Sequence, residues 1–188
     1  MAEKRLLEPA TYLFPAPCVV VSCADGGETN LITLAWAGTL CSEPPQVGIG
    51  VRRNRHSHGL LTRGGDYVVN IPAEDQARAV DFCGVRSGRE VDKWDATGLT
   101  PVPAEKVASP LIAEFPVNLE CAVRRTLELG SHDLFIGEIV AVQIDESILG
   151  PEGKIDDKRF KPLVYSFGGR YRGLGNPAGA AGFSVRGQ

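Results

Sequence analysis

Residues 30–57 constrain the fold more than any other stretch, because two adjacent prolines interrupt a segment that otherwise favours β-strands. Residues 31–41 are rich in Leu, Ile, Thr and Trp, and residues 46–51 are short and apolar. Both compositions are typical of strands. Pro44 and Pro45 remove two backbone donors and fix two φ angles, so no strand can continue through them. We therefore predict two strands separated by a sharp break.

The residues around this break suggest a ligand site. The first strand carries small residues that leave its backbone open, and a basic turn with hydroxyl and amide groups follows the second strand. A flat ligand can lie on such a strand, while the turn holds an anionic tail. Tight sheet packing and a solvated basic turn explain the same residues, so both interpretations stay open. The small residues are Thr33, Ala35, Ala37, Gly38 and Thr39, and the turn is Arg52-Arg53-Asn54-Arg55-His56-Ser57.

Length and composition predict a single domain over residues 1–188, since 188 residues with 43% apolar and 23% charged side chains suit one globular unit. The net charge of −3 argues against a nucleic-acid partner. No apolar run approaches the roughly 20 residues of a membrane helix, and the first residues do not resemble a signal peptide. We expect a cytoplasmic protein.

The five cysteines, at positions 18, 23, 41, 83 and 121, form no Cys-x-x-Cys pair. This odd, scattered set does not fit a zinc or iron–sulfur frame, and we expect mostly reduced, buried thiols. Cys41 ends the first central strand. His56 and His58 form a His-x-His pair without an evident third ligand, so no metal site is predicted.

The remaining strand-like runs follow one another through turns rather than alternating with helices. That order predicts a mostly antiparallel β-barrel. Residues 86–110 lack periodicity and are expected to form a functional or disordered loop. The Gly- and Ala-rich tail from residue 168 is expected to lie on a neighbour or to fray. Strands are expected at 16–23, 67–71, 117–129, 134–144 and 163–167, a hairpin over 19–41, and helices at 56–62 and 73–83.

The order of short motifs resembles the flavin reductase-like family and is most similar to its flavoredoxin branch. The motifs are Asn30-x-x-Thr33 with Trp36, Ser42-x-Pro44-Pro45, His56-Ser57, Asp92-Lys93, Gly130-Ser131-His132, and Pro162-Leu163-x-Tyr165. The resemblance covers roughly residues 10–175. It implies an FMN-binding split barrel, which is mostly β, antiparallel and Greek-key-like, with a few peripheral helices.

The resemblance also implies a function. Members bind FMN, or sometimes FAD, at a homodimer interface and use NAD(P)H to reduce flavin or another small acceptor. An FMN electron-transfer protein reduced by a partner protein, and an FMN-binding protein without turnover, are alternatives. The sequence does not identify the final acceptor or choose between NADH and NADPH.

Carried over by position, the resemblance assigns residues to parts of the cofactor. Residues 33–39 would line the isoalloxazine and ribityl chain, and residues 51–54 would run beside the ribityl. His56 and Ser57, with one arginine of the turn, would hold the phosphate, and Lys93 would reach the phosphate or ribityl. His132 is the candidate catalytic residue, beside the reactive face, although an ordinary turn histidine fits the sequence equally. The predicted contacts are Asn30, Thr33, Leu34, Ala35, Trp36, Ala37, Thr39, Val51, Arg52, Arg53, Asn54, His56, Ser57 and Lys93.

The turn at residues 52–57 is more basic than a single phosphate requires. An additional arginine would pair with an acidic residue or meet the phosphate of NADPH.

Overall fold

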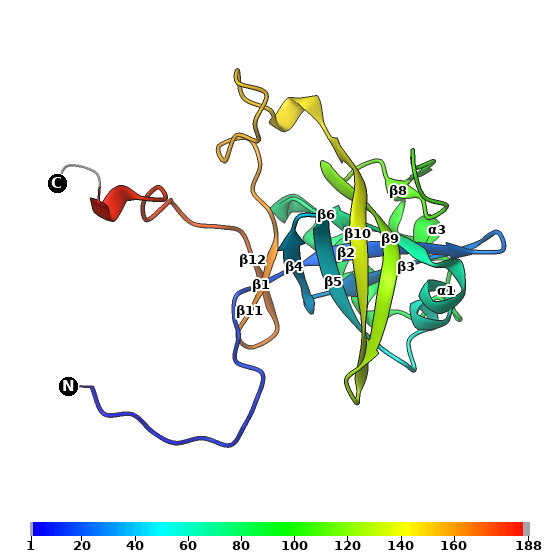
Figure 1. The fold of residues 1–188 in the computed structure, drawn as a ribbon, viewed down its shortest axis with the longest axis horizontal. Coiled ribbons are helices and arrows are strands. Elements are labelled where there is room, and N and C mark those ends of the chain that lie inside the picture. The colour runs from blue at the N-terminus through cyan, green and yellow to red at the C-terminus, as the bar shows by residue number, and fades with distance from the viewer. Residues whose placement is uncertain (1, 186–188) are drawn as a thin grey trace.

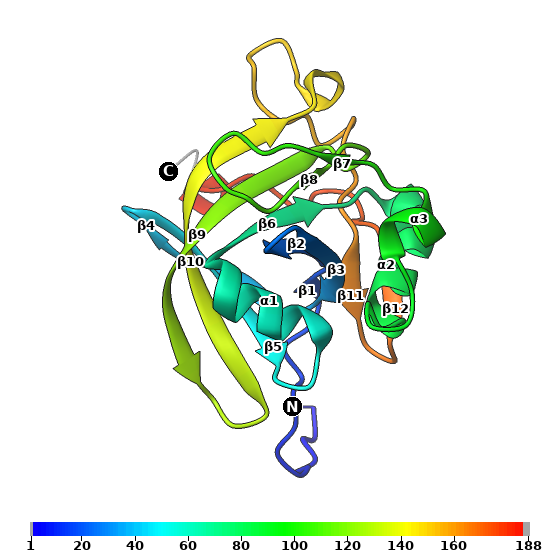
Figure 2. The ribbon, with the colours of Figure 1, turned by 90° about the vertical axis from the view of Figure 1, so that its right-hand side faces the viewer.

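The computed structural model describes residues 2–185, and its centre is a seven-stranded antiparallel sheet that curls into a barrel (Figure 2). The strand order is β3-β2-β6-β9-β10-β5-β4. This architecture confirms the predicted mostly-β antiparallel fold. The strands are β2 (Val19–Asp25), β3 (Glu28–Leu34), β4 (Ala37–Ser42), β5 (Pro45–Arg52), β6 (Asp66–Ile71), β9 (Val117–Glu128) and β10 (His132–Ile144).

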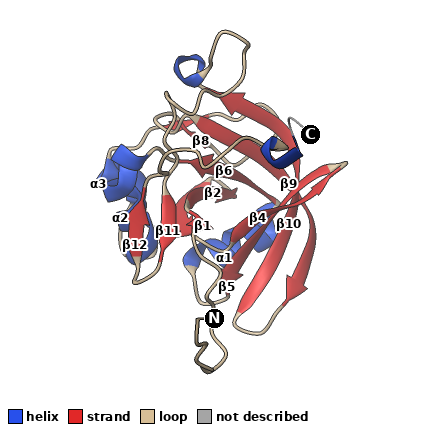
Figure 3. Ribbon diagram, turned by 90° about the vertical axis from the view of Figure 1, so that its left-hand side faces the viewer, coloured by secondary structure: helices blue, strands red, loops and turns tan. Residues whose placement is uncertain are grey.

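Smaller elements surround this sheet (Figure 3). The helices are α1 (His56–Gly64), α2 (Ala77–Val85) and α3 (Lys93–Thr97), with single 3₁₀ turns η1 (Glu74–Gln76), η2 (Glu146–Ile148) and η3 (Phe183–Val185). A three-stranded sheet joins β1 (Ala16–Pro17), β11 (Val164–Ser166) and β12 (Arg170–Arg172), and β7 (Pro101–Val102) pairs with β8 (Leu111–Ile112). None of the helices described is long and apolar enough to cross a membrane.

The segment expected as one strand over residues 31–41 is divided in two, which corrects the prediction. β3 pairs with β2 and β4 pairs with β5, so these consecutive strands are the two edges of the sheet. Only Ala35 and Trp36 join them. The backbone carbonyl of Trp36 accepts a 2.7 Å hydrogen bond from Gly50 N. The chain therefore bends at these two residues to close the barrel. The predicted break is the tight turn Glu43–Pro44 between β4 and β5, and Pro45 is the first residue of β5.

The predicted β9–β10 hairpin is present, but His132 is not in its turn. It is the first residue of β10 and pairs with Arg52 of β5. The turn is residues 129–131, closed by a hydrogen bond from Leu129 N to the carbonyl of His132. The ladder to β5 therefore fixes the backbone of His132, and the expected turn position is wrong.

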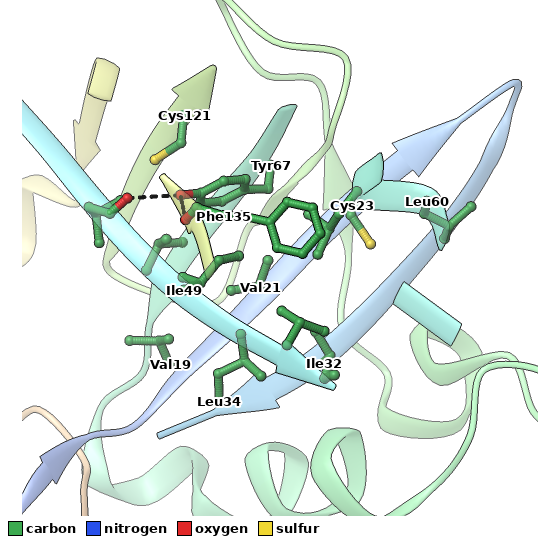
Figure 4. Close-up of a cluster of buried hydrophobic side chains, with 14 residues drawn as sticks. Val19, Val21, Cys23, Ile32, Leu34, Ile49, Leu60, Tyr67, Cys121 and Phe135 are labelled. Carbon is green, nitrogen blue, oxygen red and sulfur yellow. Dashed lines mark hydrogen bonds between the residues drawn. The ribbon is translucent and has the colours of Figure 1, made fainter. Parts of the chain in front are cut away.

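Strand β2 divides two hydrophobic cores because both of its faces are buried. Val19 and Val21 face the interior of the barrel, where Tyr67 donates a hydrogen bond to the Val47 carbonyl at 3.1 Å (Figure 4). Val20 faces a second core under α2 and α3. The alternation of a strand places successive side chains on opposite faces, so one strand supports both layers.

Two further expectations need correction. The expected loop over residues 86–110 contains α3, which Asp92 caps by accepting hydrogen bonds from the Trp94 and Asp95 backbone N–H groups. Gly98, at φ 71°, ends this helix in the left-handed conformation that favours glycine. The tail contains β12 before it projects from the body on the same side as the N-terminal arm (Figure 1).

Candidate functional site

Two adjoining cavities lie between the end of β3, helix α2 and the N-terminus of α1. The wide cavity has a volume of about 390 Å³ and the narrow one about 80 Å³. Ile32, Arg55 and Gly84 line both of them. The cavities therefore form one continuous depression with a narrow end and a broad end.

The narrow end lies at the N-terminus of α1. Arg55 is the extended N-cap residue and its side chain makes no capping bond. His56 and Ser57 begin the helix, whose first turn has no acidic residue. The first N–H groups of a helix lack internal partners and carry a partial positive charge, so this end favours an anion.

Hydrogen bonds to residues of β3 hold these two side chains in place. Asn30 Nδ2 donates to Ser57 Oγ at 2.7 Å, and both residues are buried. His56 Nε2 lies 2.7 Å from a carboxylate oxygen of Glu28. The sheet therefore fixes the orientation of the first helical turn.

Lys93 lies almost fully buried beside the narrow cavity. Its Nζ donates to the carbonyl oxygens of Leu31 and Cys83, each at 2.7 Å. Burial lowers the pKa of Lys93 to about 8, so the ammonium is still mostly charged at pH 7. A buried positive charge thus joins β3, α2 and α3 next to the narrow cavity.

The segment that follows α2 forms another wall of the narrow cavity, and the sequence did not lead us to predict it. Arg86 and Ser87, which lie between Gly84 and Gly88 in the sequence, line this cavity. A Cβ on Gly88 would lie 2.1 Å from Asn30 Oδ1, so only glycine permits this approach. A basic residue and a hydroxyl between glycines, directly after a helix, were the available signal.

Trp36 and His132 form one wall of the wide cavity. Their rings are nearly parallel, at 14°, with centroids 6.2 Å apart. Burial, and then the charge of Arg52, lower the pKa of His132 below its usual range. The imidazole is therefore neutral at neutral pH, with one nitrogen able to donate and the other able to accept a hydrogen bond.

The side chains of consecutive residues at the end of β5 and just after it point in different directions. Arg52 lines the wide cavity, whereas Arg53 pairs with Asp133 at 2.8 Å and Glu128 at 2.9 Å. Val51 is fully buried in the barrel core. Asp133 also lies 2.8 Å from His58 Nε2, and the bonds from Arg53 and His58 lower its pKa.

The thiols at the cavities are unreactive at neutral pH. Burial raises the pKa of Cys18 to about 12 and that of Cys83 to about 11. Both stay protonated and act as small apolar residues. No group of three metal-ligating side chains occurs among residues 2–185.

Most of the predicted cofactor contacts line these cavities, and four do not. Ala37 lies on an apolar groove beyond Trp36, Thr39 is exposed on edge strand β4, Val51 is in the core, and Arg53 is ion-paired. These four side chains do not line the cavities because side chains alternate along a strand and because the chain bends at residues 35–36. The structure brings together Asn30, Thr33, Leu34, Ala35, Trp36, Arg52, Asn54, His56, Ser57, Lys93 and His132, and adds Cys18, Ile32, Gly50, Arg55, Cys83, Gly84, Val85, Arg86, Ser87, Gly88, Tyr165 and Tyr171.

Known proteins share this fold, or a quarter to a third of the aligned sequence. Flavoredoxin of Desulfovibrio vulgaris (Miyazaki F) is 33% identical with a TM-score of 0.90, covering 97% of this chain and 99% of its own. Flavoredoxin from Methanosarcina acetivorans is 31% identical with a TM-score of 0.91, covering 98% of each chain. An NADH:riboflavin 5′-phosphate oxidoreductase of Streptomyces pristinaespiralis is 25% identical over 142 residues, 72% of this chain and 75% of that protein. The flavin reductase like domain matches residues 11–175. The chain belongs to the flavin reductase-like family.

Proposed function

We propose that this chain binds FMN in the two joined cavities and acts as an oxidoreductase that takes electrons from NAD(P)H. The observation that carries the proposal is the division of the depression into a small cationic end and a broad end lined by backbone, aromatic and aliphatic groups. FMN has the matching parts, a phosphate and a flat ring system joined by a flexible chain. FAD shares these parts and is the alternative ligand.

The narrow cavity supplies what a phosphate needs. Arg55 and Arg86 provide guanidinium donors, Ser57 a hydroxyl, and the first turn of α1 its free N–H groups. Charge-assisted hydrogen bonds of this kind are the strong ones in proteins. Lys93 adds a positive charge beside the cavity.

The wide cavity would hold the ring system. Bound FMN supplies the hydride chemistry itself, so no side-chain nucleophile is required. Trp36 and His132 limit access of water from one side, and the neutral His132 offers a hydrogen bond to a ring placed beside it. Tyr165 and Tyr171 of the small sheet border the same space. The chain therefore orients and shields the reacting groups.

An electron carrier is the second candidate function. The flavoredoxins, at 31% and 33% identity and nearly full coverage, favour a flavoprotein that receives electrons from a partner protein. The Streptomyces relative, whose name specifies NADH and riboflavin 5′-phosphate, favours direct reduction by a nicotinamide. Binding without redox turnover is the third alternative.

We also propose that the protein works as a homodimer. An apolar groove of about 780 Å³ runs beside Trp36, between residues 10–17 and strand β4. Leu13 is 91% exposed and Leu40 50% exposed on or near it. Burial of such surface against a second copy would gain about 25 cal/mol per Å² of apolar area, which favours association.

Two measurements test the redox proposal. Titration of the purified protein with FMN and with FAD, followed by visible absorbance and fluorescence, is expected to give tighter FMN binding. Anaerobic mixing of the loaded protein with NADH and then NADPH is expected to bleach the flavin rapidly. Slow bleaching by both nicotinamides, with rapid reduction by a reduced redox protein, would favour the carrier. Absence of flavin binding would reject the whole proposal.

A further inference from the structure

We propose that Arg52 sets the reduction potential of the bound flavin and does not hold its phosphate. The inference rests on the proposed function, because it takes the ring system to occupy the wide cavity. It changes the role expected from the sequence, where Arg52 was placed beside the ribityl or was one of the arginines that could hold the phosphate.

The position of Arg52 separates it from the phosphate end. It is the last residue of β5 and lies opposite His132 in the β5–β10 ladder, and both line the wide cavity with Trp36. It does not line the narrow cavity, where Arg55, Arg86 and Lys93 already supply positive charge. A phosphate carries about −1.5 to −2 charges at pH 7, so these three cations balance it without Arg52.

The charge of Arg52 also has no carboxylate partner. The neighbouring Arg53 pairs with Asp133 and Glu128, whereas none of the acidic side chains described forms an ion pair with Arg52. The ionisable side chains that share the wide cavity are His132, the cation Arg55, the buried thiol Cys18, and the phenols Tyr165 and Tyr171. None of these is a carboxylate, so no acidic side chain that lines the cavity neutralises the field of Arg52.

This field acts differently on the two redox states of a flavin. Transfer of a hydride from NAD(P)H brings two electrons and one proton to the neutral oxidised ring and leaves it with one negative charge; the nicotinamide becomes NAD(P)⁺. A fixed positive charge stabilises the anionic reduced ring more than the neutral oxidised ring, and more strongly where water is partly excluded. Arg52 therefore favours reduction without being required for binding of oxidised FMN.

The test compares Arg52→Gln with Arg52→Lys, which keeps the charge, and with Arg125→Gln, which removes an exposed arginine on β9 outside the cavities. For each protein the dissociation constant of oxidised FMN and the midpoint potential of bound FMN are measured at pH 7. Affinity for sulfite gives an independent readout, since sulfite adds to the oxidised ring and leaves negative charge on it. Thermal melts check that the variants are folded.

Arg52→Gln is expected to leave the affinity for oxidised FMN within about threefold. Its preference for reduced over oxidised FMN should fall about tenfold, which is about 30 mV for a two-electron couple, and sulfite affinity should fall similarly. Arg52→Lys should retain most of both values, and Arg125→Gln should match the wild type. An unchanged potential in Arg52→Gln, or a tenfold loss of oxidised FMN affinity without a change in potential, would overturn the role. A wild type that binds no flavin would instead remove the proposed function itself.

Discussion

Asn30 and Ser57, 27 residues apart in the chain, are joined by a buried 2.7 Å hydrogen bond from the amide of Asn30 to the hydroxyl of Ser57. The bond attaches the first turn of α1 to β3. The narrow cavity lies beside it, with Gly88 in close approach to the same amide. The proposed phosphate site thus depends on a contact between three segments that are distant in sequence.

Replacing His56 and Ser57 together by Ala should weaken FMN binding tenfold or more. Each lost charge-assisted hydrogen bond costs about 1.5–3 kcal/mol, and 1.4 kcal/mol is a factor of ten in affinity. Fluorescence titration of the double variant measures the effect. Thr62→Ala is the matched control, since Thr62 lies on the exposed last part of the same helix and bonds only to the His58 carbonyl. Equal FMN affinity in the double variant and the wild type would reject this assignment.

His132→Ala should slow reduction of bound FMN by about ten- to a hundredfold and leave FMN affinity nearly unchanged, because the phosphate cluster lies at the other end of the site. Single-turnover reduction at saturating NADH and NADPH measures the rate. The matched control is Ser131→Ala, which removes the hydroxyl 2.9 Å from His132 Nδ1 but keeps the ring. Equal rates in His132→Ala and the wild type would leave the histidine with a structural role only.

The lowered pKa of His132 also gives the reduction rate a pH dependence. Burial and Arg52 move the pKa below the ordinary value of about 6.5. The ring therefore stays neutral to a lower pH than an ordinary imidazole, and the decline of the rate in acid should be centred below the ordinary value. The reduction rate of His132→Ala should not show this decline at low pH, which is the acid limb of the pH profile. A limb centred above pH 6.5 in the wild type would contradict the prediction.

Lys93 should give the protein a distinct pH dependence of stability. Its pKa is about 8 in the folded chain and about 10.4 when unfolded, so between these values the unfolded state binds more protons and the contribution of Lys93 rises with pH. Relative to Lys93→Met, the wild type should gain about 3 kcal/mol between pH 7.5 and 10.5. Urea denaturation across this range measures the difference.

Comparison with Lys93→Met is necessary because buried thiols act in the opposite direction. Burial raises the pKa values of Cys18 and Cys121, which makes stability fall as the unfolded thiols ionise. This contribution is common to both proteins, because Lys93 is not among the causes of either shift. Lys106→Met, at an exposed lysine, is the control and should show no comparable gain. A constant difference between wild type and Lys93→Met across the range would contradict the assignment.

If the protein is a homodimer, light scattering of the FMN-loaded protein should give twice the chain mass of 20.1 kDa. Leu40→Glu introduces a charge into the apolar groove and should shift the protein toward the monomer. Val142→Glu is the control at a similarly exposed valine on β10 outside the groove. A wild type of about one chain mass would reject the dimer.

Much of the fold followed from local sequence. Strand alternation and β-branched residues identified β2, β6, β9 and β10, and the prolines identified the turn before β5. Helix α3 was missed because a five-residue helix is too short to show a 3.6-residue period; its signals are the capping Asp92 and the terminal Gly98. Local sequence patterns did not predict the bend at residues 35–36. That bend arises from closure of the barrel, which depends on contacts between strands that are distant in sequence.

The site was predictable in its parts and not in its arrangement. Residue types predicted an anion site at the basic turn. Arg52 ends β5 and lines the wide cavity, whereas Arg53, the next residue, pairs with two acids from another hairpin. The burial of Lys93 has a similar cause, since its two carbonyl partners lie on β3 and α2. Such placements depend on long-range contacts, which composition and spacing do not encode.

The burial of β2 on both faces has a consequence for how the molecule opens. Val19 and Val21 belong to one core and Val20 to the other, so neither core can separate while this strand keeps its place. The backbone amides of Val20 and Val21 should therefore exchange with deuterium only through global unfolding, as expected for the most protected unit of a domain. Because β3 pairs with β2 along its whole length, the β3 residues that line the proposed cofactor site share this protection. Release of a bound ligand therefore need not begin with unfolding of β3.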